Sequence, residues 1–340
     1  MVATSQAVVD FEYDPRIQSL LAQCDDDWGD PTKNRENLIP YGILPIDKAL
    51  YGIDPFGEII VIQGEEKNRK TTFLANVVCN IMTREQLKVK PVINIDSLES
   101  GMRPQKYRDT LISIMATRYL ISQSHQPRTF CHACGTEVCR HIGISPKFLR
   151  YMTRTEEQKE AIEWAKAEMD KWPLLIHGAS LKQGNTRSLQ GATKGSKDKQ
   201  ARWLRLVEVF GMQILVVDHV QQYAFSDEPT DYEKQIRAVS ALADFSTQHG
   251  NVVMALSQVS LTSVREIKNN GGQGKLVAAG GAKAAQEANT VFSTSYKPDS
   301  GVMKIKIEES RDAGSFPVWQ RVEDVSGCFY GEASREPVGE

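Results

Sequence analysis

The segment Gly52–Leu74, GIDPFGEIIVIQGEEKNRKTTFL, places the tightest constraint on what this chain can fold into. A turn leads into the apolar run Ile59–Ile62, which has strand character and breaks at Gly64 into a polar loop, and a helix-like run follows. The loop ends in Lys70 and Thr71. Strand, loop with Lys-Thr, and helix are the arrangement of a nucleotide phosphate-binding loop, in which backbone N–H groups face the phosphates and the lysine neutralises their charge.

The loop departs from the pattern G-x-x-x-x-G-K-[ST] at one position, because Arg69 stands where the second glycine is expected. Glycine tolerates unusual backbone angles and lets the chain approach the phosphate closely. We therefore expect the arginine side chain either to turn outward or to crowd the site, where it would add a cation. The loop alone leaves a plain strand–turn–helix unit as the alternative. The candidate nucleotide-binding residues of the loop are Gly64, Glu65, Glu66, Lys67, Asn68, Arg69, Lys70, Thr71 and Thr72.

Bulk composition narrows the class of protein. The chain has 340 residues, 41% of them hydrophobic and 25% charged, which suits one large globular domain or one domain with additions. No apolar run approaches the length of a membrane span, and the N-terminus lacks the layout of a secretory signal, so we expect a cytoplasmic protein. The formal net charge of −2 argues against a generally basic nucleic-acid coat but leaves room for a local basic channel.

The predicted domain organisation has three parts. Residues 1–40 form an N-terminal arm or linker that is too short for a core of its own. Packing of this arm on a neighbouring subunit and a loosely ordered tail remain alternatives. Residues 41–330 form the main domain, and residues 331–340 form a C-terminal tail.

Polar side chains follow three predicted buried strands. Glu99 comes just after the strand Pro91–Asp96, toward the crevice where open α/β sheets bind ligands, so it is a candidate for orienting or deprotonating an attacking water. A surface glutamate or helix cap is the alternative. Asp218 follows four apolar residues at the end of another predicted strand. An aspartate at this place typically holds the coordination shell of Mg²⁺, opposite the threonine of a phosphate loop. Gln258 ends another such strand and is a candidate sensor of the terminal phosphate.

Three cysteines crowd into nine residues, which in a cytosolic chain favours a metal over a disulfide framework. A small structural zinc knuckle is therefore predicted within residues 123–145, with unliganded thiols as the alternative. Ligands one residue apart require a bent backbone, so His132 or His125 remains an alternative to the histidine proposed. The predicted Zn²⁺ ligands are Cys131, Cys134, Cys139 and His141.

Two segments have the composition of nucleic-acid contacts. Lys182–Lys199 is rich in Gly, Ser, Thr, Asn and Lys and is predicted to be an exposed loop, either solvated or tracking a phosphate backbone. Between residues 265 and 283, glycines with flanking lysines would let backbone amides and ammonium groups approach a nucleic-acid strand; a disordered hairpin tip is the alternative. The candidate DNA-binding residues are Lys275, Gly280, Gly281 and Lys283.

The last third of the chain predicts a β-hairpin, because two strand-like runs, Val291–Tyr296 and Val302–Ile307, flank a turn. Arg311 follows it, either as an ordinary salt-bridging residue or as a side chain that reaches into the nucleotide site of a neighbour.

In their order, these blocks resemble the RecA-like motor domain of the DnaB family of replicative helicases, over roughly Leu38 to Tyr330. The resemblance implies an α/β fold with a mainly parallel twisted β-sheet flanked by helices. It also implies a ring of subunits, usually a hexamer, with ATP and Mg²⁺ bound between neighbours and single-stranded DNA threaded through the centre. The blocks that carry it are Gly52…Gly57-Glu58, Ser97–Glu99, Leu215–Gln221, Ala255–Gln258, Gly280-Gly281 with Gln286–Asn289, and Arg311…Gly314.

Roles follow from the resemblance by matching positions. Lys70 and Thr71 would hold phosphates and Mg²⁺, and Asp218 the metal shell. Glu99 would act on the attacking water. In the same way, Gln258 would contact the terminal phosphate. Arg311 would be an arginine finger, a side chain that reaches the nucleotide bound by a neighbouring subunit. Lys283 and the Gly280-Gly281 backbone would contact the DNA backbone.

Three departures from the family pattern stand beside these expectations. Arg69 replaces the loop glycine, Glu309 stands where a lysine is usual, and Ala279 stands near the expected DNA-contacting arginine. We also expect the motor domain to stand without the N-terminal collar of the family, which usually meets primase. We therefore expect a phage- or plasmid-type, ATP-dependent, ring-shaped helicase acting on single-stranded DNA in replication, with a primase or loader as possible partners. A nucleotide-binding oligomer with weak hydrolysis and a recombination-type ATPase are the alternatives.

Overall fold

The computed structural model describes residues 38–85, 87, 89–97, 104–123, 143–151, 154–178, 190–222, 231–258, 287–297, 301–311, 314–322 and 326–332. The chain divides into two compact units, Met1–Leu38 and Ile39–Glu340. Every helix and strand described below belongs to the second unit.

Within the described residues, nine strands form one sheet with the order β3-β2-β4-β5-β1-β6-β7-β8-β9. The strands are β1 Ile59–Gly64, β2 Val92–Ser97, β3 Leu174–Gly178, β4 Met212–Asp218, β5 Val252–Gln258, β6 Thr290–Lys297, β7 Val302–Ser310, β8 Phe316–Val322 and β9 Phe329–Glu332. The helices are α3 Leu44–Leu50, α4 Lys70–Thr83, α5 Pro104–Gln123, α6 Phe148–Tyr151, α7 Glu156–Met169, α8 Gln190–Phe210, η2 Val220–Gln222 and α9 Asp231–His249.

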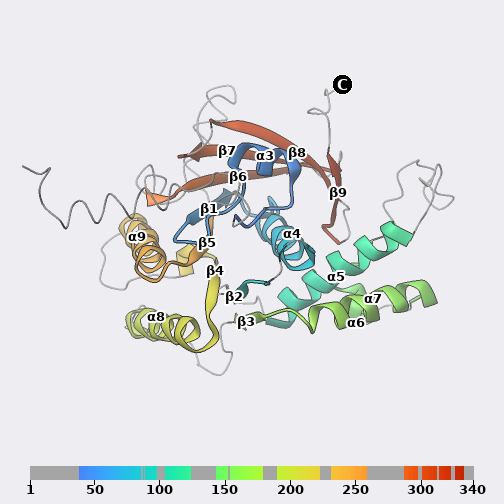
Figure 1. Ribbon diagram of the computed structural model, residues 1–340, viewed down its shortest axis with the longest axis horizontal. Helices are drawn as coiled ribbons and strands as arrows, with labels where there is room; N and C mark the ends of the chain where they lie inside the picture. Colours follow the sequence, from blue (N-terminus) through green and yellow to red (C-terminus); the bar gives the residue numbers. More distant parts are fainter. Residues whose placement is uncertain are drawn as a thin grey trace, which may run out of the picture. The chain divides into compact units, whose positions relative to one another are not determined.

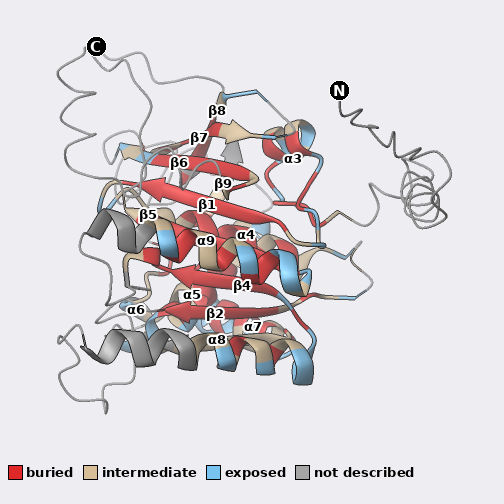
Figure 2. Cartoon of the chain, turned by 90° about the vertical axis from the view of Figure 1, so that its left-hand side faces the viewer, coloured by how far each residue is buried: buried red, intermediate tan, exposed pale blue. Residues whose placement is uncertain are grey.

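The six strands from β3 to β6 are parallel, so their carboxyl ends lie along one edge of the sheet. Figure 2 shows the arrowheads of β1, β2 and β4 pointing toward the same side. We call this side the carboxyl edge and the opposite side the amino edge. The predicted mainly parallel sheet is confirmed.

The parallel strands are buried on both faces because helices cover each face (Figure 1). Along β1, Ile60 and Ile62 pack into a cluster with α3, α4, α5 and α7, whereas Ile59 and Val61 pack into a second cluster with α8 and α9. Alternate side chains of an extended strand point to opposite faces, so a strand covered on both sides is apolar at most of its positions. This requirement explains the uninterrupted apolar runs in the sequence.

The predicted β-hairpin is present as the antiparallel pair β6–β7. Two further antiparallel strands, β8 and β9, extend the sheet beyond it and were not predicted. The sequence of β8, FPVWQRV, has a proline at its second position and no strict alternation, so it gives a weak strand signal.

One expectation from composition was wrong in part. The segment Lys182–Lys199 was predicted to be an exposed loop, but from Gln190 on it is helical, since α8 begins there and continues to Phe210; residues 182–189 lie outside the described residues. Later in the helix, Trp203 and Leu206 pack into the core. Packing of an apolar face stabilises a helix more than local propensity does, so the helix extends into a stretch that contains glycines. Among the residues that the structure describes, no helix is both long enough and apolar enough to cross a membrane.

Candidate nucleotide-binding site

The register of the sheet brings several candidate residues together at the carboxyl edge. Gly64, at the end of β1, pairs with Gln258 at the end of β5. Asp218, at the end of β4, pairs with Leu256 on one side and with Ser97 of β2 on the other. Residues that are far apart in the sequence thus meet where parallel α/β sheets bind ligands.

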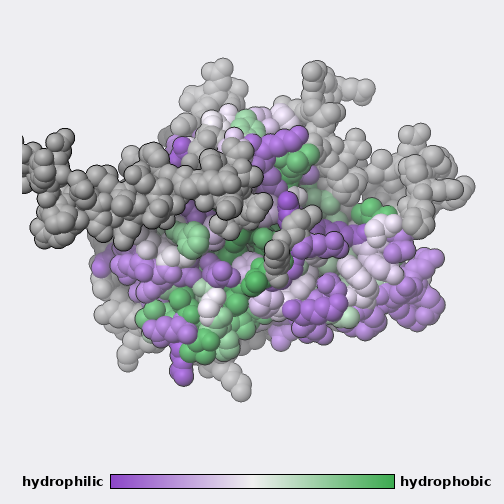
Figure 3. Space-filling model, viewed as in Figure 1, coloured by the Kyte–Doolittle hydropathy of each residue, from purple (hydrophilic) through white to green (hydrophobic). Residues whose placement is uncertain are grey.

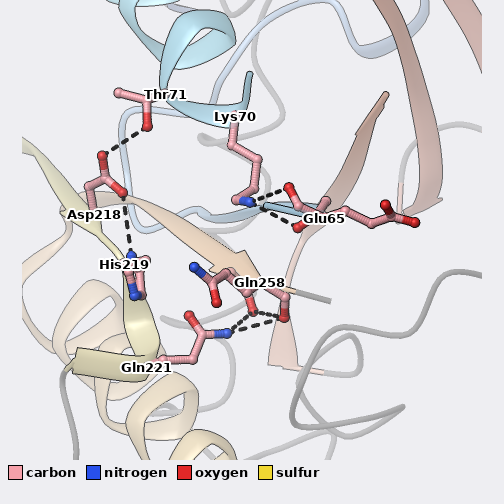
Figure 4. Close-up of polar contacts among 9 residues, drawn as sticks. Glu65, Lys70, Thr71, Asp218, His219, Gln221 and Gln258 are labelled. Atoms are coloured by element: carbon pink, nitrogen blue, oxygen red, sulfur yellow. Dashed lines mark hydrogen bonds and ion pairs between the residues drawn. The ribbon is translucent and has the colours of Figure 1, made fainter. Parts of the chain in front are cut away.

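The loop between β1 and α4 folds around the ammonium group of Lys70 (Figure 4). Lys70 Nζ donates hydrogen bonds to the carbonyl oxygens of Gly64 at 2.8 Å and Glu65 at 2.9 Å. Helix α4 begins at Lys70, so the N–H groups of its first turn lie at the same loop. A cation and a helix N-terminus together favour an anion at this position.

The first glycine of the motif is required by a close approach of β6. A Cβ atom on Gly64 would lie 2.9 Å from the carbonyl oxygen of Thr294, which is closer than a real Cβ contact. On the other side of the loop, Thr294 Oγ1 donates to the carbonyl oxygen of Asn68 at 3.0 Å. Strand β6 therefore supports the loop at two points and fixes its shape.

Arg69 adopts the backbone conformation that a glycine would adopt. Its φ of 57° and ψ of 32° lie in the left-handed region, and it is the N-cap of α4. Its guanidinium carbon lies 3.8 Å from the centroid of the Tyr296 ring, at the end of β6. A cation over an aromatic face is stabilised electrostatically, which helps to hold the side chain on β6.

Thr71 and Asp218 form the contact that is most informative about chemistry. Thr71 Oγ1 donates to Asp218 Oδ2 at 3.1 Å, and the Asp218 side chain is buried. His219 Nδ1 lies 4.0 Å from the other carboxylate oxygen of Asp218. A hydroxyl and a carboxylate beside a phosphate-binding loop are hard oxygen ligands of the kind that Mg²⁺ shares with nucleotide phosphates. These residues therefore fit a nucleotide–Mg²⁺ complex.

Gln221, in η2, holds the ends of β4 and β5 together. Its Nε2 donates to Ser257 Oγ at 3.0 Å and to the carbonyl oxygen of Gln258 at 3.2 Å (Figure 4). This contact fixes the backbone of Gln258 beside the loop.

Comparisons with known proteins locate this arrangement among characterised folds. No family model and no curated protein sequence matches the chain. The fold matches the solved ATPase domain of G40P with a TM-score of 0.65 and 16% identity, over 93% of this chain and 98% of that domain. It matches a DnaB-like replicative helicase, solved in a study of its interactions with primase, with a TM-score of 0.62 and 15% identity, over 93% of this chain and 66% of that one.

A third neighbour, a KaiC-like protein from the archaeon Pyrococcus horikoshii, has a TM-score of 0.51 and 13% identity, over 86% of this chain and 99% of that one. The fold is that of DnaB-like helicase ATPase domains. At these identities the comparisons establish the fold alone, and the roles of individual residues rest on the geometry above.

Within this DnaB-like fold, Arg311 lies far from the loop of its own chain. Its backbone N–H donates to the carbonyl oxygen of Asn289 at 3.1 Å, just before β6 begins. Thr290 pairs with Ile60 near the start of β1, so Arg311 is at the amino edge. A six-residue strand spans roughly 20 Å. The structure therefore separates Arg311 from Lys70 by about the length of β1.

The remaining loop positions have varied surroundings in the DnaB-like fold. Glu66 and Lys67 are exposed. Thr72 faces the C-terminal segment, where a Cβ atom on Gly327 would lie 2.7 Å from Thr72 Cγ2. Sequence reasoning did not identify Thr294 or Tyr296 as parts of the site, since no local pattern marks a residue that supports a loop from a distant strand. Gln221 ended one of the blocks quoted for the family resemblance, but no role was assigned to it.

Several predicted residues lie outside the part of the chain that the structure describes. They are the catalytic candidate Glu99, the zinc candidates Cys131, Cys134, Cys139 and His141, and the DNA-binding candidates Lys275, Gly280, Gly281 and Lys283. Among the described residues, no group of three or more His, Cys, Asp or Glu side chains is arranged to hold a metal ion. The zinc knuckle remains a prediction.

Proposed function

We propose that this chain is an ATP-dependent motor that acts on single-stranded DNA as a ring-shaped helicase or translocase. The observation that carries the proposal is the contact of Thr71 with Asp218 beside the ammonium group of Lys70. In the proposal, residues 41–330 form the motor and residues 1–40 an arm. Primase or a loader would be partners in replication.

The chain's own residues supply the parts needed to bind ATP and Mg²⁺. Lys70 would exchange its loop carbonyl contacts for phosphate oxygens and neutralise their charge. Thr71 and Asp218 would hold Mg²⁺, which bridges phosphate oxygens and stabilises the charge that develops on them. Gln258, fixed by Gln221 beside Gly64, would contact the terminal phosphate.

Glu99 is the proposed residue that orients the attacking water. It follows Ser97 by two residues, and Ser97 pairs with Asp218 in the sheet. The chain cannot travel more than about 3.6 Å per residue, so we propose that Glu99 lies within reach of the proposed Mg²⁺ position. A carboxylate at that place can accept a proton from water.

The position of Arg311 supports an assembly of several copies. Arg311 is exposed at the amino edge and has no ion-pair partner among the described residues, whereas the loop is at the carboxyl edge. An arginine that stabilises the transition state must reach the phosphates. Arg311 would do so only on the nucleotide of an adjoining copy. Head-to-tail contacts of this kind close into rings when the rotation allows, and the proposed ring is a hexamer.

DNA contact is proposed for the segment between β5 and β6. Both strands flank β1 in the sheet, and β5 ends at Gln258 beside the loop. Loss of the terminal phosphate, which Gln258 is proposed to contact, would thus be transmitted to the DNA-binding segment, because that segment begins at the residue after Gln258. Lys275, Gly280, Gly281 and Lys283 would contact the phosphate backbone.

The test is ATP hydrolysis measured with and without single-stranded DNA. We expect DNA to stimulate hydrolysis and Glu99→Gln to abolish it, while Glu157→Gln, a change at an exposed glutamate of α7, leaves it intact. Full hydrolysis in Glu99→Gln would remove the proposed mechanism. Tight ATP binding with negligible turnover on DNA would favour a second candidate, a nucleotide-binding oligomer with weak hydrolysis, which the presence of Arg69 in the loop supports.

A further inference from the structure

A polar cluster lies between helix α8 and the sheet, on the face opposite α4. It consists of Asn94 and Asp96 of β2, His177 of β3, and Lys199 and Arg202 of α8, and we call it the α8 cluster. Asp96 pairs with His177 one residue before the carboxyl ends of both strands. No step of the proposed ATP mechanism uses these side chains.

Asp96 is already satisfied within the protein. Its side chain is buried, and its Oδ2 accepts a hydrogen bond from Trp203 Nε1 at 2.8 Å and another from the Arg202 guanidinium group. The Arg202 contact is an ion pair. The negative charge of Asp96 is therefore balanced by the positive charge of Arg202, and the positive charge of Lys199 is in excess within the cluster.

The groups that remain unmatched are all donors. Asn94 is fully buried, and neither its Nδ2 nor the Nε of Arg202 has a hydrogen-bond partner among the described residues. Burial lowers the pKa of the Lys199 ammonium group, Asp96 opposes that shift and Arg202 adds to it. No carboxylate among the described residues forms an ion pair with Lys199. A buried donor without a partner destabilises the folded protein, so an acceptor that completes these hydrogen bonds would bind favourably.

His177 adds a further donor when it is protonated. His177 Nδ1 lies 2.7 Å from Asn94 Oδ1, and in the tautomer that carries the proton on Nδ1 the ring donates to this oxygen, so Asn94 Nδ2 still has no acceptor among the described residues. Burial lowers the pKa of His177, with Arg202 adding to the effect and Asp96 opposing it. A bound anion would reverse the penalty on both His177 and Lys199, because it favours their charged forms.

We propose that the α8 cluster binds a phosphoryl oxyanion through Lys199, the Nε of Arg202 and the Nδ2 of Asn94. A phosphate group offers several acceptor oxygens and negative charge, and converging donors with excess positive charge are what it requires. The group has two possible sources, a phosphodiester of a nucleic-acid strand and a free phosphate. The inference does not depend on ATP hydrolysis, since the cluster is separate from the loop at Lys70.

The test uses the full chain in the Lys70→Ala background, which removes the anion site of the nucleotide loop. Inorganic phosphate is titrated by calorimetry, and a single-stranded oligothymidine is titrated by fluorescence anisotropy at fixed ionic strength. The Lys199→Gln change should weaken binding about tenfold, since it removes one charge-assisted hydrogen bond. The matched control is Lys166→Gln, an exposed lysine of α7 that pairs with Glu163 on its own helix.

A second variant separates weaker binding from a loss of folding. Arg202→Lys keeps a cation beside Asp96 but removes the Nε donor, so it should weaken binding while circular dichroism stays unchanged. An effect on phosphate and oligonucleotide together identifies a phosphodiester site, and an effect on phosphate alone identifies a free-anion site. The proposal is overturned if neither probe binds, or if Lys199→Gln and Lys166→Gln bind both probes alike.

Discussion

The guanidinium group of Arg69 rests on the ring of Tyr296, with the guanidinium carbon 3.8 Å from the ring centroid, while the backbone of Arg69 keeps a left-handed conformation. The residue that breaks the loop motif thus preserves the shape that a glycine would give. We predict that Arg69→Gly leaves ATP hydrolysis within about twofold of the unmodified protein. Relief of left-handed strain, roughly 1–2 kcal/mol, is offset by loss of the cation–π contact, roughly 0.5–1 kcal/mol.

The control for this prediction is Arg69→Val. A β-branched residue is strongly disfavoured in the left-handed region, so this variant should bind ATP more weakly and unfold at a lower temperature. Steady-state hydrolysis and thermal melts measure both effects. A large gain in turnover for Arg69→Gly would show instead that the arginine restrains hydrolysis, which would support the weakly hydrolysing oligomer.

The contact between Thr71 and Asp218 predicts a dependence on Mg²⁺. Asp218→Asn should reduce hydrolysis by about 100-fold or more, since it removes the carboxylate charge proposed to face the metal. Thr71→Val should have a similar effect, whereas Thr71→Ser, which keeps the hydroxyl, should retain most activity. Binding of a fluorescent ATP analogue with and without Mg²⁺ is the measurement. If Asp218→Asn kept the full Mg²⁺ enhancement of binding, the assignment of this carboxylate would be wrong.

The separation of Arg311 from Lys70 predicts complementation between variants. Arg311→Ala and Lys70→Ala should each lower hydrolysis by roughly 1,000-fold when assayed alone, a typical effect of losing a transition-state arginine. When the two variants are mixed, hydrolysis should be partly restored. Some interfaces between subunits then combine the intact loop of an Arg311→Ala copy with the intact arginine of a Lys70→Ala copy. Arg108→Ala, at an exposed arginine paired with Asp170, is the control and should remain active. Activity that Arg311→Ala retains in full would contradict the shared site.

The sequence predicts the strands and the residues at their ends well. It predicts poorly the side-chain contacts that connect one strand or loop to another. The run Ile59–Ile62 and the position of Asp218 are visible because a strand buried on both faces is mainly apolar and each of these runs is followed by a polar residue. Tyr296 gives no such signal, because its contact with Arg69 depends on the register of β6 against β1, set by pairing across more than two hundred residues. Trp203 likewise extends α8 through packing that composition does not encode.

The cysteine knuckle predicts one structural Zn²⁺ per chain. Metal analysis of protein purified without chelator should find it, and Cys134→Ser should lose it. Closed four-ligand sites contribute to folding, so removing the metal should lower the thermal stability of the segment around residues 123–145. ATP binding should be largely unchanged. Protein that contains no zinc under these conditions would refute the site.

Asn76 of α4 connects the phosphate-loop helix to the C-terminal segment, and its replacement is expected to be severe. The side chain is fully buried, and its Nδ2 donates to the carbonyl oxygens of Thr72 and Gly327, each at 2.9 Å. Its Oδ1 accepts from the backbone N–H of Phe329 at 3.0 Å and from Arg118 at 3.1 Å. Asn76→Leu would leave these partners without their hydrogen bonds.

At roughly 1–3 kcal/mol for each buried group left unpaired, the free energy of unfolding should fall by about 3–5 kcal/mol in Asn76→Leu. Asn80→Ala is the matched control, because Asn80 lies one turn further along α4 and is only half-buried, with hydrogen bonds to Tyr41 and Gly42. Its loss should be about 1 kcal/mol. Urea denaturation measures both values. Equal losses in the two variants would mean that the C-terminal segment does not depend on Asn76, and that α4 is held in place chiefly by its apolar face.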